Sequence, residues 1–123
     1  MSGNSIFIDT NIALYLLAGD STMKDLLYGK RVFISAISQL ELLSYHKLTA
    51  NERAGIKEFI NQCTVVELTE QVKKSTILLR KKYNFKLPDS IIVASALVEQ
   101  LPLLTTDKQL EKTTEVNTVI YTF

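Results

Sequence analysis

Short apolar runs alternate along this chain with longer segments in which apolar residues recur every three or four positions. A short apolar run predicts a buried strand, whereas the three-to-four spacing predicts a helix with one face against a core. The strands predicted in this way cover residues 6–8, 31–36, 63–68, 101–106 and 116–123. The predicted helices cover residues 10–17, 22–28, 37–48, 49–62, 69–85 and 88–100, and the last of these is apolar on nearly all sides, which predicts that it is buried.

The regular alternation of strands and helices predicts an α/β fold. We expect a three-layer α/β/α sandwich, in which helices cover both faces of a mostly parallel central sheet. The sequence has 123 residues with four glycines, two prolines and no linker-like stretch, so it predicts a single domain over residues 1–123. Functional sites in such sheets form at the carboxyl ends of the strands, near the point where the strand order reverses.

The composition is that of an ordinary globular protein, with 46% hydrophobic residues and a net charge of +1. Because the net charge is small, any binding of nucleic acid has to come from a local patch. The one cysteine, Cys63, excludes an internal disulfide and favours a reducing, cytoplasmic location. No apolar run approaches the roughly 20 residues that cross a bilayer, so we expect no membrane segment.

Four acidic residues stand where a predicted strand gives way to a helix, or within the first turns of a helix. They are Asp9, Glu41, Asp89 and Asp107. In a doubly wound sheet the carboxyl ends of the strands share one edge, so all four carboxylates can converge there.

Each of these acids also has a simpler interpretation. Asp9 and Asp107 suit the cap position of a helix. The stretches Ser38–Glu41 and Thr106–Gln109 fit capping boxes. Asp89 lies in a first helical turn, where a negative charge is favourable. Placement alone therefore leaves the cap and the site interpretations both open.

The choice of side chains favours a site, because Ser or Thr would cap a helix without placing a charge there. Polar neighbours that can support the acids are Thr10, Asn11, Ser38 and Thr105. Converging carboxylates repel one another unless a cation lies among them. Hard oxygen ligands without His or Cys select Mg²⁺ or Mn²⁺, and such an ion suits the attack of water on a phosphodiester.

A basic run precedes Asp89 in the sequence and carries Arg80, Lys81, Lys82 and Lys86 together with two aromatic residues. One interpretation is a solvated helix end whose positive charges complement the helix dipole. The other is a rim that binds the phosphates of a nucleic-acid substrate beside the acids, with base stacking on the aromatic rings.

Four stretches taken together resemble the PIN-domain family, and most closely its VapC-type toxins. The stretches are "FIDTNIALYLL", "ISAISQLELL", "LPDSIIVASAL" and "LLTTDKQL", and the resemblance covers essentially the whole chain. It implies an α/β/α sandwich and an endoribonuclease that depends on Mg²⁺ or Mn²⁺. It further implies a homodimer that acts as the toxin of a toxin–antitoxin pair and is neutralised by an antitoxin protein.

The resemblance also assigns individual residues. Asp9, Glu41 and Asp89 match the three acids on which the family relies most, and Asp107 matches its more variable fourth acid. Thr105 matches a hydroxyl residue near that fourth acid. Two rival functions remain, namely a PIN-like subunit that only binds protein or RNA, and a receiver-like signalling module that binds Mg²⁺.

Overall fold

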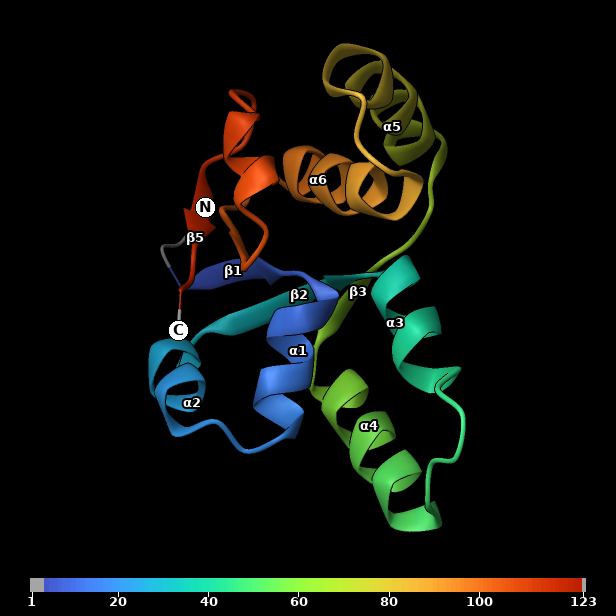
Figure 1. Ribbon diagram of the computed structural model, residues 1–123, viewed down its shortest axis with the longest axis vertical. Helices are drawn as coiled ribbons and strands as arrows, with labels where there is room; N and C mark the ends of the chain where they lie inside the picture. The colour runs from blue at the N-terminus through green and yellow to red at the C-terminus, as the bar shows by residue number, and fades with distance from the viewer. Residues whose placement is uncertain (1–3, 123) are drawn as a thin grey trace.

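The computed structural model describes residues 4–122 as one α/β unit (Figure 1). Its strands are β1 (Ser5–Ile8), β2 (Arg31–Ser35), β3 (Thr64–Val66), β4 (Leu103–Thr105) and β5 (Thr118–Ile120). Its α-helices are α1 (Thr10–Leu17), α2 (Ser21–Leu27), α3 (Ala36–Leu43), α4 (Ala50–Gln62), α5 (Glu70–Tyr83) and α6 (Leu87–Glu99). A short 3₁₀-helix, η1, spans Lys108–Lys112.

The five strands form one parallel sheet in the order β3-β2-β1-β4-β5. The central strand β1 pairs with β2 on one side and with β4 on the other, and Phe7 lies opposite Leu103 in the second pair. The strand order therefore reverses between β1 and β4, which is the position where parallel sheets of this class build their sites. The α/β class and the parallel sheet predicted from the sequence are confirmed.

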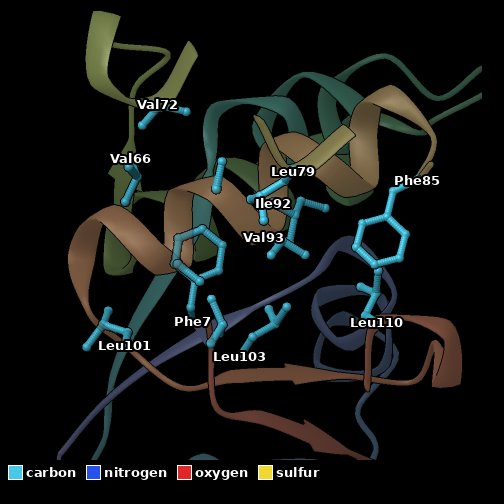
Figure 2. Close-up of a cluster of buried hydrophobic side chains, with 13 residues drawn as sticks. Phe7, Val66, Val72, Leu79, Phe85, Ile92, Val93, Leu101, Leu103 and Leu110 are labelled. Atoms are coloured by element: carbon cyan, nitrogen blue, oxygen red, sulfur yellow. The ribbon is translucent and has the colours of Figure 1, made fainter. Parts of the chain in front are cut away.

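Two hydrophobic cores lie on opposite faces of the sheet because adjacent strand residues point to opposite faces. Phe7, on one face, packs in the core that also contains Val72 and Leu79 of α5 and Val93 of α6 (Figure 2). Ile8, the next residue, packs in the core beneath α1, α2 and α4. Helices thus cover both faces, and the predicted three-layer sandwich is confirmed (Figure 1).

Helix α6 is the buried helix that the sequence predicted, with seven buried residues in succession from Ser90 to Ala96. Its two buried serines are tolerated because each hydroxyl donates to a backbone carbonyl one turn earlier, Ser90 to Lys86 at 3.0 Å and Ser95 to Ile91 at 2.7 Å. The helix has 13 residues. Within residues 4–122 no helix is both long and apolar enough to cross a membrane.

Several element boundaries differ from the predicted ones. Helix α3 ends at Leu43 rather than at residue 48, and the chain then turns through Lys47, whose φ is +61°. The turn is needed because Leu48 packs against the core on the α1 face and Thr49 must be extended to cap α4. Strands β3, β4 and β5 are also shorter than the strands predicted at residues 63–68, 101–106 and 116–123. The sequence did not predict η1. Residue 123 of the last predicted strand lies outside the described residues.

Candidate functional site

Two of the four acids follow the ends of strands, and the other two lie in helices. Asp9 follows β1, Glu41 lies in the helix after β2, and Asp107 lies two residues beyond β4. Asp89 is the third residue of α6. A cavity of about 140 Å³ lies among these elements, and it is bordered by Asp9, Thr10, Asn11, Glu41, Pro88, Asp89 and Ile92. Asp107 stands outside that lining but close enough to act on the charges of Asp9 and Asp89.

Asp9 caps a helix and also borders the cavity. Its Oδ1 accepts a hydrogen bond from the backbone N–H of Ile12 at 2.9 Å, which caps α1. Its Oδ2 accepts a hydrogen bond from the hydroxyl of Thr105, a fully buried residue at the end of β4. The two interpretations left open by the sequence are therefore compatible, since each carboxylate oxygen has its own partner.

Thr105 also ties Asp107 to this edge. Its hydroxyl oxygen accepts a hydrogen bond from the backbone N–H of Asp107 at 3.0 Å. The side chain of Asp107 caps η1 by accepting from the backbone N–H of Gln109 at 2.9 Å. The capping box predicted for Thr106–Gln109 is therefore wrong, because Asp107 and not Thr106 is the cap of η1.

Glu41 accepts a hydrogen bond from the hydroxyl of Thr10 at 2.6 Å, and Thr10 also contacts the hydroxyl of Ser38 at 2.8 Å. The cap of α3 is Ser35, whose hydroxyl accepts from the backbone N–H of Ile37 at 3.1 Å. Ser38 lies inside the helix, so the capping box predicted for Ser38–Glu41 is wrong, and Glu41 is held by another helix instead.

Two of the four acids, Asp9 and Asp89, have raised pKa values. Burial raises the pKa of Asp9 above its ordinary value, the charge of Asp107 adds to this, and hydrogen bonds from Thr105 and Ile12 oppose it. The pKa of Asp89 is raised first by burial and then by the charges of Asp107, Asp9 and Glu41. Lys86 is the cation that opposes this rise. This edge of the sheet therefore holds more negative charge than its own residues neutralise.

The donor set fits a hydrated divalent cation. Within residues 4–122, no three His, Cys, Asp or Glu side chains come together as a ready-made metal cage. Asp9, Glu41 and Asp89 nevertheless border one cavity, and they offer the hard oxygen ligands that Mg²⁺ and Mn²⁺ prefer. Mg²⁺ usually keeps several of its waters, so it needs few direct protein ligands and bridges the remaining distance through water.

The structure separates the basic residues that the sequence grouped together. Lys86, which precedes α6, is the member of the run that acts on the charge of Asp89. The Nε of Arg80 donates to the backbone carbonyl of Phe85 at 3.2 Å, and Lys82 forms an ion pair with Glu115 at 2.9 Å. Lys81 is exposed.

Sequence reasoning missed two residues that line the cavity, Pro88 and Ile92. Ile92 could have been found from helical spacing, because it is three positions after Asp89 and residues three apart share a face of a helix. Pro88 shares that face because it lies four positions before Ile92. It also missed the backbone of Thr106, which hydrogen-bonds Asp9. A backbone donor leaves no signal in side-chain identity.

Comparisons with known proteins agree with this geometry. A search of curated protein sequences found no significant match. A toxin–antitoxin complex from Klebsiella pneumoniae contains a similar chain, with 25% identity, a TM-score of 0.80, and coverage of 90% of this chain and 94% of that chain. VapBC2 from Rickettsia felis, bound to a DNA fragment from its promoter, gives 17% identity and a TM-score of 0.85 over 96% of this chain and 99% of that chain.

VapBC-1 from nontypeable Haemophilus influenzae gives 21% identity and a TM-score of 0.76, covering 94% of this chain and 97% of that chain. These structures share the fold described above. The sequence profile of the PIN domain matches residues 6–116. Since that match spans nearly all of the sheet and every helix, this chain belongs to the PIN-domain family.

Proposed function

We propose that this protein is an endoribonuclease that hydrolyses RNA phosphodiester bonds with the help of Mg²⁺ or Mn²⁺. The observation that carries the proposal is the placement of Asp9, Glu41 and Asp89 around one cavity, with Asp107 close enough to raise the pKa values of two of them. Membership of the PIN-domain family supports it, because PIN-domain toxins are generally nucleases.

In this proposal the acidic residues have different roles. Asp9 and Glu41 are held by hydrogen bonds from Thr105 and Thr10 and would serve as ligands of the ion. The bound ion supplies Lewis acidity, which polarises a phosphate oxygen and lowers the pKa of a coordinated water. Asp89, the one acid of the four without a hydrogen-bond partner within residues 4–122, is free to accept a hydrogen bond from the attacking water.

The substrate side of the cavity is assigned to Lys86 and Asn11. Asn11 borders the cavity, and Lys86 lies close enough to lower the pKa of Asp89. A cation in this position would hold a neighbouring phosphate of the RNA and offset the charge of the acids. Arg80, Lys81 and Lys82 remain predictions as substrate contacts, since Arg80 and Lys82 already have partners in the fold.

The partner that we propose is an antitoxin protein. Similar structures are named as toxin–antitoxin and VapBC complexes, which supports the role of this chain as the toxin of such a pair. The homodimer implied by the family resemblance also remains a prediction, and sedimentation of the purified protein would test it. The family match leaves no support for the receiver-like alternative.

The experiment that tests the activity compares Asp9→Asn with Asp20→Asn. Both aspartates cap a helix, and Asp20 does so by accepting a hydrogen bond from the backbone N–H of Met23 at 2.8 Å. Asparagine is also a good helix cap, so neither substitution should unfold the helix that it caps. Asp20 does not border the acidic cavity, so its substitution removes one charge and leaves the site unchanged. Purified proteins are incubated with a mixed RNA pool in Mg²⁺, in Mn²⁺ and in EDTA.

We expect wild type and Asp20→Asn to cleave RNA in either metal, and Asp9→Asn or EDTA to abolish cleavage. Cleavage by Asp9→Asn at the wild-type rate would refute the site. Binding of RNA without cleavage in any metal would favour the alternative function, a PIN-like subunit that only binds RNA or protein.

A further inference from the structure

The hydroxyl of Thr10 makes two short contacts but has only one proton. Its Oγ1 lies 2.6 Å from an oxygen of Glu41 and 2.8 Å from the hydroxyl oxygen of Ser38. A carboxylate can only accept a hydrogen bond, so the Thr10 proton goes to Glu41. Ser38 must then donate its own proton to Thr10. The three residues form a chain of hydrogen bonds that runs in one direction, from Ser38 through Thr10 to Glu41.

Other buried helical hydroxyls in this protein behave differently. Thr76 and Ser95 each donate to the backbone carbonyl one turn earlier in the same helix, and Ser90 donates to the backbone carbonyl of Lys86, the cap residue of α6. Thr10 and Ser38 lie in the first turn of α1 and α3, where no such carbonyl of their own helix is available. Their protons are therefore free to act on side chains, and they act on an acid of the site.

The position of the Glu41 side chain depends mainly on the hydrogen bond from Thr10. Its single hydrogen bond within residues 4–122 that involves the side chain comes from Thr10, whereas Asp9 has both Ile12 and Thr105. A glutamate side chain also has more rotatable bonds than an aspartate, so it loses more conformational freedom when it binds a ligand. Fixing Glu41 before binding removes that cost.

We propose that Thr10 is a positioning residue that places Glu41 as a ligand for the divalent cation, and that Ser38 sets the direction of the Thr10 proton. This inference rests on the proposed function, because it assigns Glu41 to metal binding. Ser38 is fully buried and cannot reach RNA itself, so any effect of its substitution has to pass through its neighbours.

Calorimetric titration of Mn²⁺ into the metal-free protein tests the inference without measuring cleavage. Thr10→Val removes the donor to Glu41, and Ser38→Ala removes the donor to Thr10. Thr10→Ser keeps the hydroxyl and should restore binding. The matched controls are Thr76→Val and Ser95→Ala, which make the same chemical changes in buried hydroxyls of α5 and α6 that donate only to backbone carbonyls.

We expect Thr10→Val to weaken Mn²⁺ binding about 10-fold, which is the usual scale for losing a residue that holds a metal ligand, and Ser38→Ala to weaken it about 2-fold to 3-fold. Thr10→Ser and both controls should keep the wild-type Kd. Excess Mn²⁺ should restore the cleavage rate of Thr10→Val, while its affinity for RNA in EDTA stays unchanged.

Equal Kd values for Thr10→Val and Thr76→Val would overturn the inference. If Thr10→Val does not fold, Ser38→Ala against Ser95→Ala decides in the same way. Failure of the proposed function is distinguishable, because it would appear as no RNA cleavage by the wild-type protein in any metal, whereas the comparison of Kd values for Mn²⁺ does not depend on cleavage.

Discussion

The surroundings of Asp9 and Asp89 at the edge of the sheet raise their pKa values, whereas the surroundings of Glu115 lower its pKa. At the acidic edge of the sheet, Asp9 and Asp89 have raised pKa values because they are partly buried beside other acids. At the far end of α5, Glu115 accepts a hydrogen bond from the Tyr83 hydroxyl at 2.6 Å and one from the Lys82 ammonium at 2.9 Å. The Tyr83 bond and then the Lys82 bond lower the pKa of Glu115 to about 2.

The difference shows that this fold can supply donors and a cation to an acid where the role of that acid is structural. The Glu115 network, formed by Lys82, Tyr83, Thr114 and Glu115, ties the segment after η1 to the end of α5. At the acidic edge, burial and the charges of Asp107, Asp9 and Glu41 raise the pKa of Asp89, and Lys86 opposes this rise without reversing it. Negative charge left without a partner in this way is typical of a site that receives its counter-ion from outside.

The largest difference should come from replacing one carboxylate by its amide at the acidic edge and one in the Glu115 network. Asp89→Asn should reduce RNA cleavage about 100-fold or more, which is the scale of a lost acid–base group. Glu115→Gln should leave cleavage within about 2-fold of wild type, because Glu115 does not border the acidic cavity. Initial rates in saturating Mn²⁺ measure both. Equal losses in the two variants would show that the acidic edge has no special role.

A smaller effect should separate the lysines of the basic run. Lys86→Gln should weaken binding of RNA to the inactive Asp9→Asn protein about 3-fold and flatten its dependence on salt, because one phosphate contact is lost. Lys81→Gln removes the same charge from an exposed position on α5 and serves as the control. Fluorescence anisotropy at several salt concentrations gives both slopes, and identical slopes would remove Lys86 from the substrate surface.

The Glu115 network should contribute to stability and not to activity. Tyr83→Phe keeps the ring that stacks on Phe85 but loses the hydroxyl, which should cost about 1 kcal/mol of unfolding free energy. Tyr28→Phe is the control, since Tyr28 is 89% exposed. Urea denaturation measures both variants, and an unchanged midpoint for Tyr83→Phe would show that the network is too exposed to matter.

The smallest expected effect is the difference between Asp9 and Glu115 in how each changes the pH dependence of stability, measured in EDTA. The pKa of Asp9 is raised on folding, so its ionisation opposes folding, and stability is lost as the pH rises through the folded-state pKa. Asp9→Asn should therefore be more stable than wild type at neutral pH and equally stable in acid. Besides burial, the charge of Asp107 raises the pKa of Asp9.

Glu115 should show the reverse dependence. Its pKa is lowered on folding, so its contribution is present above its ordinary pKa and is lost as the pH falls towards about 2. Glu115→Gln should be less stable than wild type at neutral pH and equal to it in strong acid. Unfolding curves at a series of pH values test both signs, and a shared sign would contradict the contrast between the two groups.

The sequence predicted the fold because apolar runs and helical spacing are local patterns that survive in the folded chain. The same argument placed Asp9 and Asp107, because a carboxylate one or two residues after a buried strand has its position set by the end of that strand. The end of α3 was missed because it depends on Leu48 reaching a core built by other elements.

The supporting contacts could not be predicted from the sequence. Tyr83 and Glu115 are 32 positions apart, and nothing in either segment indicates the other. The direction of the Thr10 proton depends on Ser38, which lies 28 positions away in another helix. Pairings of this kind are set by how the helices pack. Thr10 and Ser38 were therefore predicted as polar neighbours of the acids, but their contact with each other was not, and the role of Glu115 was not predicted at all.

The hydrogen bond between Thr105 and Asp9 joins residues 96 positions apart, and β1 gains its second neighbour only when β4 arrives. A ribosome that has made β1, β2 and the helices α1 to α6 has therefore still not made the strand that completes the acidic edge. Under the proposed function, a nascent chain would be unable to cleave RNA at that stage, including the message from which it is being translated. Its activity would then begin late in synthesis, after more than 100 residues have been joined, together with the last strands of the sheet.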